Sequence, residues 1–181
     1  MTPNPPLRIE VTPARGWQRI VQRLAATALA GWFLSRWLPT LDRFILKQTH
    51  GKQTAASFLT GLPILTLTTF GAKTNQPRVC PLVPLPDGEK VILIASNFGN
   101  PHHPAWYINL RAHPEALLTH NGIQTAYTAR EATESERQIY WAQAVKLYPG
   151  YQLYEQRARG RKIPILILIP KNEELPCTLP S

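Results

Sequence analysis

The sequence has few cysteines and few acidic residues for its length. Only Cys80 and Cys177 are present, the first in a strand-like run and the second in a proline-rich tail, which excludes a framework of disulfide bridges and favours a cytoplasmic location. The chain has 20 Lys and Arg but 11 Asp and Glu, which gives a formal net charge of +9. A polyanionic partner is therefore favoured: a nucleic acid, an anionic membrane or an acidic cofactor.

Two common nucleotide-binding motifs are also missing. No Gly-x-Gly-x-x-Gly follows an expected strand, and no Gly-x-x-x-x-Gly-Lys-Ser/Thr occurs. The usual backbone cradles for nicotinamide dinucleotides and for nucleoside triphosphates are thereby excluded. An anionic cofactor would need a different site.

No uncharged run near the start of the chain is long enough to form a transmembrane helix. The longest, Leu24 to Ser35, falls short of the ~20 residues that a bilayer requires. Apolar residues recurring at intervals of three and four nonetheless predict a basic amphipathic helix that ends at Pro39. Its aromatic residues fit either packing on the protein body or peripheral contact with the inner face of the membrane, and both alternatives stay open. These aromatic residues are Trp32, Phe33 and Trp37.

One compact domain is expected, because 44% of the residues are hydrophobic and suffice for a sizeable core. We divide the chain into a disordered segment over 1–16, a helical region over 17–49, a barrel domain over 50–170 and a tail over 171–181.

Six runs of alternating or continuous apolar residues predict strands. They cover residues 63–70, 78–85, 90–96, 116–120, 123–130 and 163–169. Helices are expected over Ala105 to Ala112, from a capping box at Thr133 and Glu136 through Leu147, and in a further turn after Pro149. Strands and helices do not alternate regularly, which favours an α+β antiparallel barrel over a doubly wound parallel sheet.

A loop between the first two expected strands, Gly71 to Arg78, has the composition of an anion site. It combines two cations with several hydrogen-bond donors, and Gly71 and Asn75 tolerate the positive φ that turns backbone N–H groups to one side. The donors and cations are Lys73, Thr74, Gln76 and Arg78. An ordinary solvated hairpin tip is the alternative for this loop taken alone.

Together with later motifs, this loop resembles the deazaflavin-dependent nitroreductase family, which are split-barrel oxidoreductases that use coenzyme F-420. The other motifs are Ala95-Ser96-Asn97, His103 to Leu110, Ala129-Arg130-Glu131, Leu147 to Tyr151 and Arg161 to Ile165. The resemblance covers about Leu41 to Pro170 and implies an FMN-binding split-barrel type of fold with about six strands. It also implies hydride transfer from reduced F-420 to an electron-poor acceptor: a quinone, a nitro compound or a conjugated enone.

The resemblance implies a role for three groups of residues. The first group holds the phosphate, the acidic tail and the ring of the cofactor and comprises Lys73, Thr74, Gln76, Arg78, Pro81, Ser96, Asn97, His103, Trp106 and Asn109. The second group surrounds the substrate and comprises Val83, Tyr148, Tyr151 and Tyr154. The third group would supply a proton or hydrogen bond in catalysis and comprises Tyr148, Tyr151 and Ser96. We expect the tyrosines to lie over the cofactor groove, outside the packing of the barrel itself.

Several features depart from the family pattern or leave alternatives open. Ala72 replaces a basic residue, Val83 replaces an aromatic one found in some relatives, and the bulky Phe98 follows the serine strand.

FMN in the same barrel is the nearest alternative to F-420 as the cofactor, and a cofactor-free barrel that binds lipid is another alternative. Nucleic acid is disfavoured because the strands show no aromatic stacking pattern.

A pair of histidines and a run of basic residues are not interpreted as functional sites. Adjacent His102 and His103 point to different sides and have no third ligand at helical spacing, so no metal site is expected. The cations between Arg157 and Lys162 are interpreted as a solvated loop before the last strand. The expected partner is a small-molecule acceptor, and both a monomer and a homodimer stay open.

Overall fold

The computed structural model describes residues 6, 7, 9 and 63–171. These contain seven strands: β1 (Leu65–Phe70), β2 (Pro77–Leu82), β3 (Leu85–Asp87), β4 (Lys90–Ile94), β5 (Glu115–His120), β6 (Ile123–Glu131) and β7 (Ile165–Pro170). They also contain the short 3₁₀ turn η1 (Asn97–Gly99) and three α-helices: α4 (Ala105–Ala112), α5 (Glu134–Leu147) and α6 (Gly150–Arg157).

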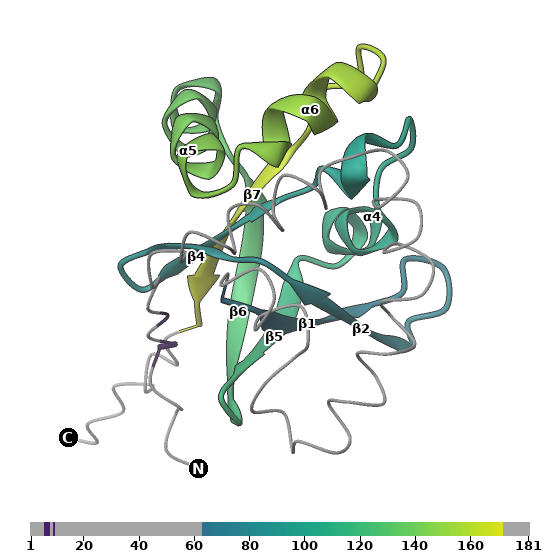
Figure 1. Ribbon diagram of the computed structural model, residues 1–181. Helices are drawn as coiled ribbons and strands as arrows, with labels where there is room; N and C mark the ends of the chain where they lie inside the picture. The colour runs from purple at the N-terminus through teal and green to yellow at the C-terminus, as the bar shows by residue number, and fades with distance from the viewer. Residues whose placement is uncertain (1–5, 8, 10–62, 172–181) are drawn as a thin grey trace, which may run out of the picture.

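The strands form one antiparallel sheet in the order β2-β1-β5-β6-β7-β4-β3. The sheet curls strongly in Figure 1, which is consistent with a split barrel and confirms the α+β class. Seven strands replace the expected six because the run over 78–85 divides into β2 and β3. The division falls at Val83 and Pro84, where proline lacks the N–H that a continuous ladder would need.

Local signals in the sequence account for several of the element boundaries. Asn121 and Gly122, with φ of 51° and 81°, form the two-residue turn between β5 and β6. Thr133 and Glu136 form both hydrogen bonds of the expected capping box, and α5 runs to Leu147 as predicted. Helix α4 also has the predicted bounds.

The helices cover the two ends of the curled sheet. Helix α4 lies against β1, whereas α5 and α6 lie together beyond β7 and β4 (Figure 1). Both faces of β4 are buried, since Val91 and Leu93 enter one core cluster while Ile92 and Ile94 enter the other. This confirms that the continuous apolar run is covered on both sides.

Two residues of the segment expected to be disordered lie in the core instead. Leu7 and Ile9 are buried, and the Leu7 N–H donates to the Tyr127 hydroxyl at 3.1 Å. Apolar side chains in a polar, proline-rich segment had given too weak a pattern to predict this. The helical region 17–49, its membrane contact and the tail beyond Lys171 lie outside the described residues. Within the part that is described, no helix is both long and apolar enough to cross a bilayer.

Candidate functional site

The backbone of the Gly71–Arg78 loop closes tightly on itself. The Gly71 N–H donates to the Gln76 carbonyl at 2.9 Å, and the Asn75 N–H donates to the Gly71 carbonyl at 2.7 Å. Asn75 has the left-handed φ of 50° that the sequence predicted. Gly71, unlike Asn75, does not adopt a positive φ, and a Cβ atom there would lie 2.6 Å from Thr74 Oγ1, so a larger residue would require the Thr74 side chain to move. The loop therefore has a defined shape.

The side chains of this loop that could bind an anion are exposed. They are Lys73, Thr74, Gln76 and Arg78. Among the described residues, the recorded ion pairs involve neither Lys73 nor Arg78. The two positive charges are thus available to an anionic ligand, and charge-assisted hydrogen bonds from them would be the strongest contacts that the loop could offer.

Asn109 of α4 fixes the position of this loop. Its buried side chain accepts a hydrogen bond from the Ala72 N–H at 3.0 Å and donates to Thr69 Oγ1 at 3.1 Å. The residue was predicted to line the cofactor groove, and these contacts give it a supporting position behind the loop. Trp106, one turn earlier on α4, is buried in the same core as β1. Because both side chains face the sheet, α4 and the loop are held as one unit.

The segment after β4 has an unusual backbone. Asn97, Phe98 and Gly99 have successive φ values of 50°, 56° and 78°. The left-handed region is strained for a bulky residue such as Phe98, and such strain is typical of functional segments. The segment packs on α6, where a Cβ on Gly99 would lie 2.8 Å from the Tyr154 carbonyl oxygen. Ser96 stands directly before this stretch.

The interpretation of Arg161 as part of a solvated loop is wrong. Its guanidinium donates to the carbonyls of Ala95 at 3.3 Å, Ser96 at 2.7 Å and Asn100 at 3.0 Å. It also contacts His103 Nδ1 at 3.2 Å. No local pattern could reveal these contacts, because the partners lie 58–66 residues earlier in the chain.

The tyrosines are part of the core packing, so the expectation that they stand outside it is wrong. Tyr148, Tyr151 and Tyr154 are buried in one cluster with residues of β4 and β7 such as Ile92 and Ile167. Their aromatic rings supply much of the apolar surface between α5, α6 and the sheet, which is the physical reason for their burial.

The hydroxyls of two tyrosines meet inside this cluster. Tyr148 and Tyr154 place their oxygens 3.2 Å apart, and either can donate. Burial raises the pKa of Tyr148, Tyr151 and Tyr154, so each phenol keeps its proton at neutral pH. All three hydroxyls can therefore donate a hydrogen bond, but the raised pKa makes each a weaker acid than an ordinary phenol.

The predicted residues gather in two groups. The loop and α4 form the first. The second contains the tyrosines and the Ser96 segment, joined where the Phe98 ring meets the Tyr154 ring edge-on with centroids 5.9 Å apart. Val83 packs against the tyrosine cluster and Pro81 is half-buried in β2. Across the described residues, no three His, Cys, Asp or Glu side chains come together as a metal site.

A curled antiparallel sheet with an exposed cationic loop fits the class of split-barrel proteins that bind an anionic ligand. The model of the family "F420H(2)-dependent quinone reductase" matches residues 41–170, and the chain belongs to this family. It is 32% identical over 112 residues to an F420H(2)-dependent quinone reductase of Mycobacterium tuberculosis, a match that covers 59% of this chain and 72% of the relative.

Two solved structures are similar in fold and sequence. An F420-H2 dependent reductase (FDR-A) is 36% identical with a TM-score of 0.54, covering 59% of this chain and 93% of the other. A chain described as a domain-swapped dimer is 33% identical with a TM-score of 0.57, covering 74% of this chain and 98% of the other. These similarities confirm the resemblance seen in the sequence.

Proposed function

We propose that this protein is an oxidoreductase that transfers a hydride from reduced coenzyme F-420 to a quinone. The family match supports this activity, and the observation on the molecule that carries it is the loop Gly71–Arg78. Two exposed cations stand on a backbone that Asn109 anchors to α4, which suits a ligand bearing phosphate and carboxylate groups. Nitro compounds and conjugated enones are further acceptors that the same chemistry permits.

We assign the binding of the cofactor to residues of both groups described above. The loop residues Lys73, Thr74, Gln76 and Arg78 would bind its phosphate and acidic tail. Ser96 and Asn97 would orient its ring. The left-handed backbone at Asn97 supports this assignment, since strained segments of this kind are typically held in place for function.

Protein residues would balance the charge that develops on the acceptor. When bound, reduced F-420 supplies the hydride. A quinone that accepts a hydride becomes an anion and needs a proton or hydrogen bond. Tyr148 and Tyr151 are protonated at neutral pH, as any phenol is, and burial raises the pKa of each further, so they are candidates to donate a hydrogen bond to this charge; Ser96 is the third candidate donor.

The loop assignment predicts that two single substitutions weaken cofactor binding. Lys73→Ala and Arg78→Ala should each raise the Kd for F-420, because a charge-assisted contact contributes about 1.5–3 kcal/mol. The salt dependence of binding should also become less steep, because fewer charges contact the ligand. Fluorescence titration of F-420 measures both quantities, and Lys90→Ala, on an exposed strand end away from the loop, is the matched control.

The same titration separates the cofactor alternatives. The parent protein should bind F-420 more tightly than FMN when the two are compared side by side. Tighter binding of FMN would instead support the flavin alternative, and parental affinity in both loop variants would refute the loop assignment. A homodimer and peripheral membrane contact stay predictions, for which sedimentation of the protein alone and with anionic vesicles is the test.

A further inference from the structure

We infer that Arg161 is a positioning residue, whose guanidinium holds the segment Ala95–His103 in the conformation that presents Ser96 and Asn97 to the cofactor. This inference rests on the proposed function, which places those two residues against the ring. It adds a residue from the other end of the chain, since Arg161 precedes β7 and its partners follow β4.

The hydrogen bonds of Arg161 enclose the strained part of the segment. The guanidinium donates to the Ala95 and Ser96 carbonyls before the left-handed stretch and to the Asn100 carbonyl after it. An unfavourable backbone conformation of this kind persists only where surrounding contacts hold it. Further support comes from Asn97, whose Nδ2 donates to the His102 carbonyl at 2.9 Å, from the Gly99 N–H, which donates to the Ser96 carbonyl at 3.0 Å, and from packing on α6.

Arginine suits this task better than lysine. The Arg161 side chain forms hydrogen bonds with four different residues. This number of bonds requires the several N–H donors that a planar guanidinium carries. A lysine ammonium has a single nitrogen and could satisfy only part of this set. The positive charge alone is therefore insufficient to hold the segment.

Arg161 also determines the state of His103. Because a guanidinium only donates, His103 Nδ1 must accept, and the neutral ring then carries its proton on Nε2. His103 lines a cavity of about 250 Å³ together with Tyr107 and Glu131. Burial, Arg161 and Arg111 lower the pKa of His103, whereas Glu131 opposes them.

The first test compares kinetic constants with cofactor affinity. Arg161→Gln and Arg161→Lys should lower kcat for F-420-dependent reduction of menadione by at least about tenfold, which corresponds to ~1.4 kcal/mol in the barrier. The Kd for F-420 should change by less than about threefold, because the loop still binds the anionic groups. Arg159→Gln, an equal change of charge at an exposed position of the same connection, should retain parental kcat.

The second test requires no cofactor. In Arg161→Gln, the pKa of His103 should rise toward its ordinary value, because a neighbouring cation and a donor to Nδ1 are both removed. Titration of the His103 ring signals by NMR, assigned with His103→Gln, measures this change. In Arg161→Ala, added guanidinium ion should partly restore kcat, whereas sodium chloride at equal ionic strength should not.

The outcomes separate the two proposals. Parental kcat in both Arg161→Gln and Arg161→Lys, or an unchanged His103 pKa in Arg161→Gln, would overturn the inference. Should Arg161→Gln fail to fold, Arg161→Lys decides, because it keeps the charge and removes the fork. If the parent neither binds F-420 nor oxidises its reduced form, the proposed function fails, whereas the His103 titration still tests whether Arg161 contacts the segment through His103.

Discussion

Buried phenols are the residues on which the proposed catalysis can be tested most directly. Tyr148→Phe and Tyr151→Phe remove one hydroxyl each and keep the ring that packs in the core. Removal of a hydroxyl that donates only in the transition state should lower kcat and kcat/KM together. We expect at least about a tenfold loss for one of the two variants, or ~1.4 kcal/mol in the barrier, at nearly unchanged F-420 affinity.

Tyr140→Phe is the control for this pair. Tyr140, on α5, is likewise buried as a residue, but its hydroxyl donates to Asp87 Oδ2 at 2.7 Å and has no assigned role in the reaction. Turnover should therefore stay parental in this variant. If Tyr148→Phe and Tyr151→Phe also turn over at the parental rate, the proton comes from Ser96 or solvent, and the tyrosines act in packing alone.

At the scale of single residues, the sequence predicted which side chains could bind an anion better than it predicted the tertiary contacts of individual residues. The donors and cations of the Gly71–Arg78 loop are exposed as expected, because they are close together in the chain and follow a turn signal. The burial of Tyr151 and the contacts of Arg161 depend instead on elements distant in sequence. No local pattern contains that information.

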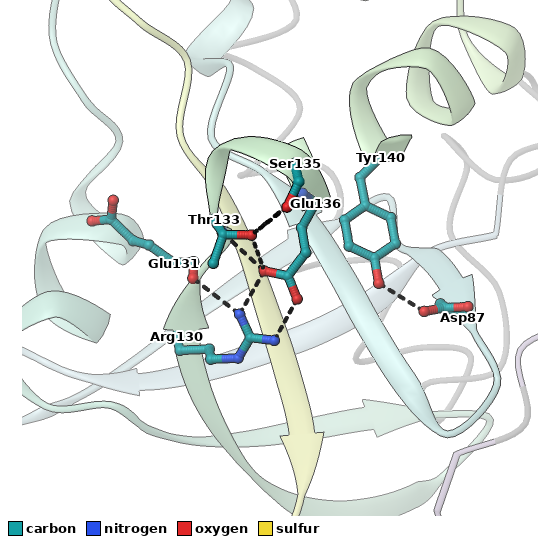
Figure 2. A network of polar contacts seen from close by, with 7 residues as sticks. All are labelled: Asp87, Arg130, Glu131, Thr133, Ser135, Glu136 and Tyr140. Atoms are coloured by element: carbon teal, nitrogen blue, oxygen red, sulfur yellow. Dashed lines mark hydrogen bonds and ion pairs between the residues drawn. The ribbon is translucent and has the colours of Figure 1, made fainter. Parts of the chain in front are cut away.

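At the scale of elements, a polar network joins the end of β6 to the start of α5 (Figure 2). Glu136 accepts hydrogen bonds from Arg130 at 2.6 and 2.8 Å and from the Thr133 N–H at 2.8 Å. The hydrogen bonds from Arg130, followed by that from the Thr133 backbone, lower the pKa of Glu136 to about 2. The same figure shows Tyr140 binding Asp87, which ties β3 to the helix.

This network predicts a specific dependence of stability on pH. Because the pKa of Glu136 is about 2 when folded and 4.5 ordinarily, its contribution is complete above pH 4.5 and is lost as the pH falls toward 2. Glu136→Gln should therefore lower the free energy of unfolding at neutral pH and reduce its decline across that acid range. Urea unfolding at several pH values measures both effects.

Glu134→Gln is the matched control on the same helix turn. Its carboxylate pairs with Lys162 on an exposed surface, where ion pairs contribute little to stability. We expect a smaller change in the free energy of unfolding than for Glu136→Gln. If the free energy of unfolding declined equally between pH 4.5 and 2 in Glu136→Gln and in the parent, the network would not stabilise the junction of β6 and α5.

At the scale of the whole molecule, the helix bounds were predictable and the closure of the fold was not. Proline and capping signals lie next to the ends of α4 and α5, so the sequence alone locates them. The division of β2 from β3 and the packing of Leu7 and Ile9 in the core depend on tertiary contacts. Leu7 and Tyr127, for example, meet across 120 residues of chain.

This contact predicts that the start of the chain stabilises the entire sheet. Leu7 is 4% exposed, and its N–H donates to the hydroxyl of Tyr127, which in turn donates to the Glu89 carbonyl at 3.4 Å. Leu7→Ala should lower the free energy of unfolding by about 2–5 kcal/mol, because a buried leucine is replaced by a cavity. Leu153→Ala, at a position that is 40% exposed, should change it by less than about 0.5 kcal/mol. Urea unfolding measures both values, and F-420 affinity should stay parental in both variants because neither residue belongs to the Gly71–Arg78 loop. An unfolding midpoint in Leu7→Ala equal to that of the parent would mean that Leu7 does not contribute to the stability of the core.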